Sequence, residues 1–363
     1  MARRTLALGA LLIAAPALAH AAPVVAAGYS LTLLGSSPAG DTGADSITSV
    51  GNDYFVGYGD HHLPDGSDGL SSTIVEYSIT GGVVGSVSVA GHNDGLRYNA
   101  GTGQIWAIQN EDSNPNLVLI NPLTLAASQA YSIPSPHGGG YDDVAFSGGK
   151  AYLTASNPTV DGNGNSTGLP ALVSATIPTS GTTLSIVNVL AGNASATSTN
   201  TGAPVTLNIT DPDGVITTPD GSVQFTSQGD STLITVKNPG AANQSVSQLS
   251  LAAQVDDIAY PTAGDQTLLF TDATTNNLYA LSGAFSPNQT FVAASFPDGA
   301  AVPGSALGSL NAATGDITPV VSGVNPGGLQ FVPVAVPEPA SFLALGTGLL
   351  ALLGLRRRKP SAP

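Results

Sequence analysis

The chain has 363 residues, no cysteine and a formal net charge of -15. The absence of cysteine excludes disulfide bonds and thiol chemistry, and a chain of this length can bury a stabilising core without them. Only 9% of the residues are charged, whereas Gly, Ser, Thr, Ala and Asn are abundant. This composition disfavours long helices and favours many short strands joined by tight turns.

The N-terminal segment has the order of a secretory signal peptide. Two arginines precede an apolar run over residues 6–15, and small residues end the segment at Ala19 and Ala21. The run is shorter than the roughly 20 residues that a membrane-spanning helix needs, which argues against a retained anchor. We therefore expect residues 1–21 to form a signal helix that is cleaved after Ala19 or Ala21.

The body of the chain, which we place at residues 22–335 as an exported domain, is strongly acidic. Its only basic residues are Arg97, Lys150 and Lys237, against 23 acidic residues, so its formal charge is -20. Such a charge repels nucleic acid and anionic lipid headgroups and attracts divalent cations or basic partners. We expect no nucleic-acid partner.

A repeated pattern runs through this body. A polar step with Asp or Gly precedes a short apolar strand, and a turn with Gly leads to a second strand. The six steps are Ala44-Asp45-Ser46-Ile47, Asn93-Asp94-Gly95-Leu96, Asp142-Asp143-Val144-Ala145, Pro212-Asp213-Gly214-Val215, Asp256-Asp257-Ile258-Ala259 and Pro326-Gly327-Gly328-Leu329. Their second residues are separated by 49, 49, 70, 44 and 70 residues.

Three of these intervals fit one four-stranded propeller blade each, and the two longer ones fit a blade with an insertion or extra strands. Over residues 29–334 the pattern resembles the β-propeller fold, for which we predict six or seven blades. The strand expected at Tyr29–Leu34 would join the final blade and close the ring. A β-sandwich or β-solenoid remains the alternative, because short strands between turns are typical of those folds too.

The aspartates of the steps are the first candidate site. Inner strands line the channel of a propeller, so these carboxylates could converge there, and Ca²⁺ takes six to eight oxygen ligands. Asp142 and Asp256 could join them. The alternative is that each aspartate binds nearby backbone N–H groups and is structural. The candidate metal ligands are Asp45, Asp94, Asp143, Asp213 and Asp257.

Four histidines remain in the body, namely His61, His62, His92 and His137. With Asp60, the pair of adjacent histidines could bind a transition metal or serve in acid and base catalysis. Adjacent residues of an extended strand point to opposite faces, so such a pair chelates one metal only within a loop. We expect these histidines to be solvated loop residues.

The body contains no motif of a serine hydrolase, a zinc protease or a phosphate-binding loop. We therefore expect a non-catalytic binding or structural role with no catalytic residue. The alternative is a Ca²⁺-dependent hydrolase acting outside the cytoplasm, by resemblance to the propeller lactonases, which use a central metal.

The C-terminal segment, residues 336–363, has three parts in a fixed order. A short polar turn is followed by 16 apolar residues, 340–355, and by a basic cluster. The turn is Val336, Pro337, Glu338 and Pro339, and the cluster is Arg356, Arg357, Arg358 and Lys359. This order resembles the PEP-CTERM sorting signal, which implies cutting near the motif by the membrane protease exosortase.

The apolar run is slightly shorter than the roughly 20 residues of a membrane-spanning helix, and flanking residues can supply the difference. The basic cluster should remain on the cytoplasmic side and the body outside. We expect a transmembrane helix that anchors the protein until it is processed, after which the body reaches the cell surface or the extracellular matrix. The resemblance further implies an exopolysaccharide or biofilm partner.

Overall fold

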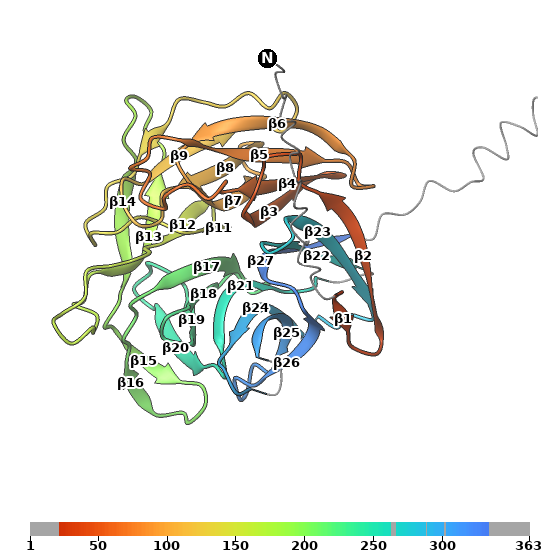
Figure 1. Ribbon diagram of the computed structural model, residues 1–363. Coiled ribbons are helices and arrows are strands. Elements are labelled where there is room, and N and C mark those ends of the chain that lie inside the picture. The colour runs from red at the N-terminus through yellow and green to blue at the C-terminus, as the bar shows by residue number, and fades with distance from the viewer. Residues whose placement is uncertain (1–21, 263–265, 288, 301–302, 334–363) are drawn as a thin grey trace, which may run out of the picture.

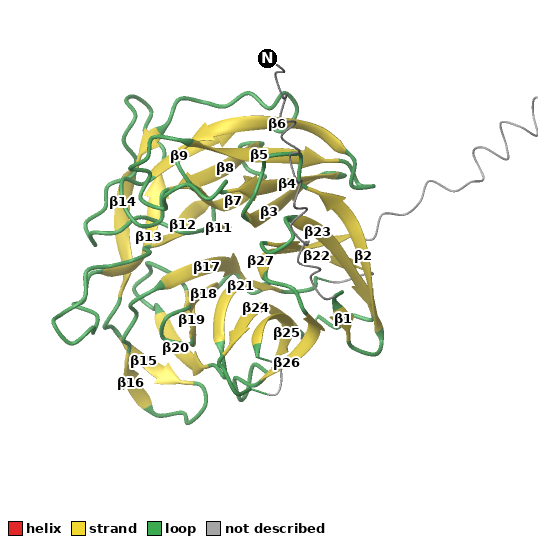
Figure 2. Cartoon of the chain, in the orientation of Figure 1, coloured by secondary structure: helices red, strands yellow, loops and turns green. Residues whose placement is uncertain are grey.

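The computed structural model describes residues 22–262, 266–287, 289–300 and 303–333, which form strands and loops without a helix (Figure 2). Six sheets stand side by side in a ring, so the fold is a six-bladed β-propeller (Figure 1). The predicted all-β propeller is confirmed, and the ring has six blades. The expected signal helix and C-terminal helix lie outside the described residues.

The first three blades are regular four-stranded sheets. Blade 1 consists of β3 (Ala44–Val50), β4 (Asp53–Tyr58), β5 (Ser71–Tyr77) and β6 (Val83–Ala90). Blade 2 consists of β7 (Asn93–Asn99), β8 (Gln104–Gln109), β9 (Asn116–Ile120) and β10 (Tyr131–Ser132). Blade 3 consists of β11 (Val144–Ser147), β12 (Lys150–Thr154), β13 (Pro170–Thr176) and β14 (Ser185–Ala191).

Blade 4 carries an additional hairpin. Its regular strands are β17 (Pro212–Thr217), β18 (Val223–Ser227), β19 (Thr232–Lys237) and β20 (Ser245–Ser250). The hairpin is formed by β15 (Ser195–Ser198) and β16 (Pro204–Thr206), and β15 pairs in parallel with β20. These extra strands account for the long interval before Asp213.

The last two blades are interleaved in sequence. Blade 5 contains β21 (Gln254–Ala259), β24 (Thr290–Phe296), β25 (Gly304–Leu310) and β26 (Ile317–Ser322). Blade 6 contains β22 (Gln266–Asp272), β23 (Asn277–Gly283) and β27 (Pro326–Pro333). The chain therefore leaves blade 5 after one strand, forms a hairpin of blade 6, and returns. The second long interval is thus shared between two blades, where the sequence predicted one enlarged blade.

The N-terminal strands close the ring. β2 (Tyr29–Ser36) pairs with β23 as the outer strand of blade 6, which confirms the predicted closure. A second short strand, β1 (Val24–Val25), pairs with β26 of blade 5. The start of the exported domain is therefore fastened to two neighbouring blades.

Apolar clusters fill the interfaces between neighbouring blades, with one cluster for each of the six contacts. Between blades 2 and 3, Trp106 is 3% exposed and meets the ring of Phe146 edge to face at 5.2 Å. Burying one such side chain contributes about 1.5–3 kcal/mol. The ring is held together by these face-to-face contacts, since each blade buries its two apolar faces on its neighbours.

The six predicted steps begin the six innermost strands, β3, β7, β11, β17, β21 and β27. Their first residues line one shared cavity, and their last residues line two others, so the inner strands all run in the same direction. We call the end of the ring where these strands begin the acid end, and the end where they stop the exit end.

Candidate cation-binding site

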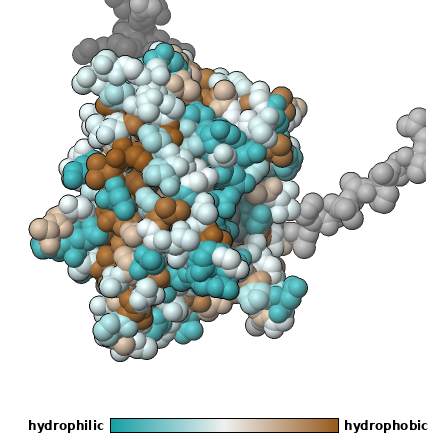
Figure 3. All heavy atoms as spheres, turned by 90° about the vertical axis from the view of Figure 1, so that its left-hand side faces the viewer, coloured by the Kyte–Doolittle hydropathy of each residue, from teal (hydrophilic) through white to brown (hydrophobic). Residues whose placement is uncertain are grey.

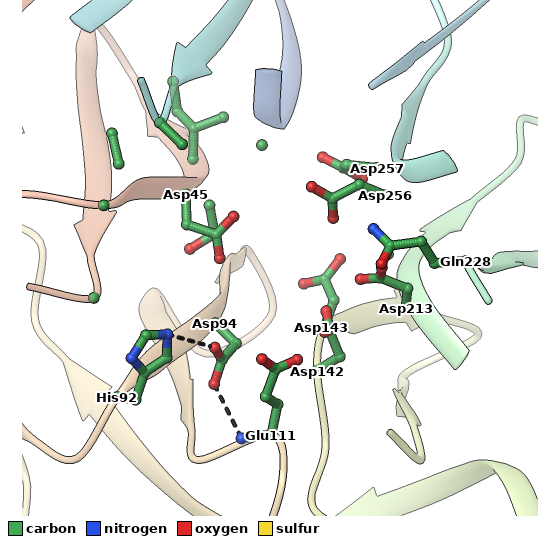
Figure 4. A pocket seen from close by; sticks show the side chains of 18 of the residues that line it. Asp45, His92, Asp94, Glu111, Asp142, Asp143, Asp213, Gln228, Asp256 and Asp257 are labelled. Carbon is green, nitrogen blue, oxygen red and sulfur yellow. Dashed lines mark hydrogen bonds and ion pairs between the residues drawn. The ribbon is translucent and has the colours of Figure 1, made fainter. Parts of the chain in front are cut away.

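A cavity of about 330 Å³ opens at the acid end and is lined almost entirely by carboxylates (Figure 4). Two cationic side chains, those of His92 and Arg97, lie among them. The cavity has room for several water molecules or for a small hydrated ligand. The lining carboxylates are Asp45, Asp94, Glu111, Asp142, Asp143, Asp213, Asp256 and Asp257.

The inner strands place these side chains in pairs of blades. A Cβ at Gly95 of blade 2 would lie 2.4 Å from the backbone oxygen of Asp142, and one at Gly214 of blade 4 would lie 2.7 Å from that of Asp256. Gly328 of blade 6 packs in the same way against Asp45. Only glycine permits this approach, so each odd-numbered blade brings its carboxylate close to the preceding even-numbered blade.

These contacts make Asp142 and Asp256 the structural equivalents of Asp45, one residue before the positions that the sequence aligned with it. Asp143 and Asp257 also line the cavity, but each reaches toward the following blade. Asp143 Oδ2 accepts a hydrogen bond of 3.2 Å from the Val215 N–H, and Asp257 Oδ2 accepts one of 2.7 Å from the Leu329 N–H.

The structure thus brings all five candidate aspartates to one cavity and divides them by their surroundings. Asp143 and Asp257 hold neighbouring inner strands together. Asp45, Asp94 and Asp213 point toward the centre of the cavity, as do Asp142, Asp256 and Glu111 (Figure 4).

Asp213 carries the clearest sign of an unmet requirement. Its side chain is 8% exposed, and among the described residues its carboxyl group is hydrogen-bonded only to that of Asp142. Such a contact between two acids needs a proton on one of them. In addition, Asp143 Oδ1 is buried without any partner among the described residues. A buried carboxylate without donors is costly, so the cavity requires protons or a cation.

The proton affinities follow from this crowding. Burial, followed by the charge of a neighbouring carboxylate, raises the pKa of Asp45, Asp142 and Asp213 well above its ordinary value. Burial also raises the pKa of Asp94 to about 7, although His92 opposes the shift, and raises that of Asp256 to about 7 with help from the charge of Asp257.

His92 forms a pair with Asp94 at the rim of the cavity. Its Nε2 lies 3.1 Å from Asp94 Oδ1, and the second oxygen of Asp94 accepts a hydrogen bond of 3.1 Å from the Glu111 N–H. Burial lowers the pKa of His92, but the hydrogen bond and charge of Asp94 outweigh burial, so its pKa is raised overall.

The prediction of solvated loop histidines is therefore wrong for His92. It is also wrong for His137, which is fully buried and whose Nε2 lies 2.6 Å from the Gly140 carbonyl oxygen. Within the adjacent pair, His62 Nδ1 lies 3.7 Å from an oxygen of Asp68, at the partly exposed surface, and His61 is exposed.

Arg97 forms the floor of the cavity. Its Nη2 lies 2.6 Å from Asp143 Oδ2, and its Nε donates a hydrogen bond of 3.3 Å to the Val144 carbonyl oxygen. Burial lowers the pKa of Arg97, but the charges of Asp143 and Asp257 raise it overall. Because Arg97 also lines both cavities at the exit end, it separates them from the acid cavity.

The carboxylates do not form a ready-made metal site as they stand: no three His, Asp or Glu side chains of the described residues are grouped as ligands of one ion. The donor set consists of hard oxygen atoms, which suit Ca²⁺ or Mg²⁺ and not soft metals. Because they repel one another, these side chains can hold a cation only through a change of rotamer or through bridging water.

Sequence reasoning missed Glu111, Arg97 and the role of His92. Glu111 follows β8, in a connection at the acid end, and no spacing rule relates it to the steps. Arg97 lies two residues beyond Gly95 on the same inner strand, so its direction into the channel was readable from strand alternation once that strand was assigned.

The fold and the cavity define a six-bladed propeller with an acidic channel. Residues 335–359 match the family described as the PEP-CTERM protein-sorting motif. The motif implies a protein that is exported and sorted by exosortase to the cell surface. No helix within the described residues is long and apolar enough to cross a membrane.

No curated protein matches this chain. Among solved structures, it is similar to a functionally unknown protein from Desulfotomaculum acetoxidans, with a TM-score of 0.45, 11% identity and coverage of 80% of this chain and 90% of that one. It is also similar to virginiamycin B lyase from Staphylococcus aureus (0.44, 12%, 85% and 89%) and to a putative gluconolactonase (0.42, 10%, 84% and 84%). These likenesses carry no argument about activity.

Proposed function

We propose that this chain is an exported propeller that binds a hydrated divalent cation, Ca²⁺ in the first place, in its acid cavity. Its role outside the cytoplasm is binding and not catalysis. The observation that carries the proposal is Asp213, a buried carboxylate that points into the cavity and has no N–H or hydroxyl donor among the described residues.

A cation explains the cavity better than protons alone. At neutral pH the raised pKa values leave several of the carboxylates partly ionised, while only His92 and Arg97 offset them, and Arg97 is already paired with Asp143. Ca²⁺ accepts six to eight oxygen ligands in flexible geometry, including water, so it tolerates carboxylates that come from different strands. Such binding would be retained at the pH of most extracellular media.

The test is calorimetric titration of the metal-free body, residues 22–335, with Ca²⁺, together with melting curves. We expect stoichiometric binding and a higher melting temperature. Asp213→Asn should weaken binding at least tenfold. Asp298→Asn makes the same chemical change at an exposed residue of the acid end and should leave binding unchanged. Absence of Ca²⁺ or Mg²⁺ binding by the unmodified body would refute the proposal.

A Ca²⁺-dependent hydrolase is the second candidate, and the His92–Asp94 pair favours it. A histidine held by a carboxylate beside a cavity is an arrangement that can accept a proton from water. Hydrolysis of lactones or phosphoesters by the calcium-loaded body, lost in His92→Gln with calcium affinity retained, would select this function. The same screen without turnover would leave the binding role.

The sorting motif supports the remaining parts of the proposal. Exosortase would cut near Pro337-Glu338-Pro339, after anchoring of the precursor by the apolar run 340–355, and would release the body to the cell surface or matrix. The side of the ring near β14 mixes polar and apolar residues without one large apolar patch (Figure 3). A surface of this kind suits hydrated partners such as matrix polysaccharides.

A further inference from the structure

The last strand of the propeller leaves the ring at the exit end. β27 is an inner strand and begins with Gly327 and Gly328 beside Asp45, at the acid end. Its later residues, Gln330 and Phe331, line a cavity at the exit end. The described chain therefore ends at Pro333 on the side opposite the acid cavity.

Little sequence separates this point from the sorting signal. Only residues 334–336 lie between Pro333 and Pro337, and the apolar run begins at Ala340. Seven residues span at most ~25 Å even when fully extended. A propeller joined to a membrane by so short a segment cannot turn over, because the segment would have to pass around the ring.

Charge is distributed unequally between the two ends. Lys150 begins β12 and Lys237 ends β19, so both lysines of the body lie at the exit end, and both are exposed. Few carboxylates accompany them. The described carboxylates at the exit end are Asp53, Glu76, Asp220 and Asp316.

All other described carboxylates lie at the acid end, in the cavity or in the connections around its mouth. Those outside the cavity are Asp41, Asp60, Asp65, Asp68, Asp112, Asp161, Asp211, Asp230, Asp272 and Asp298. Exposed apolar residues do not distinguish the ends, since Leu63 and Leu70 lie at the acid end while Val83 and Leu123 lie at the exit end. The two ends therefore differ in charge and not in hydropathy.

We propose that the unprocessed protein rests with its exit end against the lipid bilayer and its acid cavity directed away from it. This inference depends on the membrane anchor proposed above and not on cation binding. The nearly neutral exit end can approach anionic headgroups, whereas the acid end is repelled by them. The cavity consequently stays open to the medium before the chain is cut, and the processing enzyme meets the exit end.

The test uses the full chain, whose lack of cysteine allows single labels. Exit-end variants are Thr102→Cys and Ser180→Cys, and acid-end controls are Ser67→Cys and Asn163→Cys, all at exposed positions. Each labelled protein is reconstituted into vesicles of phosphatidylethanolamine and phosphatidylglycerol that contain a nitroxide lipid. We expect the lipid to quench fluorophores at the exit end at least threefold more than those at the acid end.

Equal quenching at both ends, or stronger quenching at the acid end, would overturn the orientation. Failure of the chain to float with the vesicles would overturn the anchor and the orientation with it. Calcium titration of the same preparations tests the cavity independently, so a failure of the cation site is distinguishable from either result.

Discussion

Carboxylates of the acid cavity hold protons more tightly in the folded chain than in the unfolded chain. The pKa of Asp94 and that of Asp256 are both raised from 3.8 to about 7. Between these values the folded state binds more protons than the unfolded state, so the free energy of unfolding falls as pH rises. Each group contributes a slope of about 1.4 kcal/mol per pH unit in this window.

We therefore predict that the metal-free body loses stability steadily from pH 4 to pH 7, as measured by urea unfolding. Because a cation replaces the protons, Ca²⁺ should raise the melting temperature more at pH 8 than at pH 5. Asp213→Asn should flatten the pH dependence and stabilise the metal-free body at pH 8, since it removes one repelling charge. A stability that rises with pH across this window would contradict the assigned shifts.

A second prediction concerns Arg97, whose guanidinium lies 2.6 Å from Asp143 Oδ2 in a buried pair. Arg97→Met keeps an apolar stem but leaves Asp143 without its counter-charge, and we expect a loss of about 3–5 kcal/mol in denaturant unfolding. Lys237→Met removes an exposed cation and should change stability by no more than about 0.5 kcal/mol. Equal effects of the two substitutions would exclude a structural role for the buried pair.

At the scale of single elements, the glycines of the inner strands set the distance between blades. A Cβ at Gly95 would lie 2.4 Å from the backbone oxygen of Asp142 and 2.8 Å from the Cα of Asp143. Gly95→Ala should therefore force blades 2 and 3 apart and lower the free energy of unfolding by about 3 kcal/mol.

The matched control for this prediction is Gly162→Ala, where a Cβ meets nothing within 4 Å. Thermal unfolding should show no measurable change for this variant. A Gly95→Ala protein with native stability would mean that the inner strands can separate without cost, and the close packing of the channel would then need another explanation.

The inner strands were predictable because each starts with a step that combines Asp or Gly with an apolar run, and this combination survives in a linear reading. Membership of a sheet was not predictable for β22 and β23. Their turn signals resemble those of any hairpin, and nothing in them indicates that they pair with β27, some 50 residues later, instead of with β21. Pairing of this kind is decided by packing across blades.

The candidate site was predictable to a similar extent. The sequence pointed to a channel of aspartates, and Asp45, Asp94 and Asp213 do point into it. It could not separate Asp142 from Asp143, because the side chain that faces the cavity is fixed by the contact of Gly95 with the neighbouring strand. Glu111 enters the cavity from a connection, where no periodicity applies.

For the molecule as a whole, the sorting motif gives the fourth prediction. Replacing Pro337-Glu338-Pro339 by alanines should leave a longer, membrane-retained form in the native host, because exosortase would lack its recognition sequence. Immunoblots of membrane and culture fractions measure this. Replacing Asn163 and Ser166 by alanine, in an exposed loop, should leave processing unchanged. Normal release of the motif variant would show that the motif is not read.

The pairing of the first strands with the last ones orders events in time. β1 and β2 emerge first from a ribosome or a translocon, but β1 pairs with β26 and β2 pairs with β23, which follow some 250 residues later. Blade 6 is complete only with β27, three residues before the sorting signal. The ring therefore cannot close during synthesis of its first five blades. An exported chain of this design crosses the membrane with its ends unpaired, and its final folding step coincides with the arrival of the segment that decides its destination.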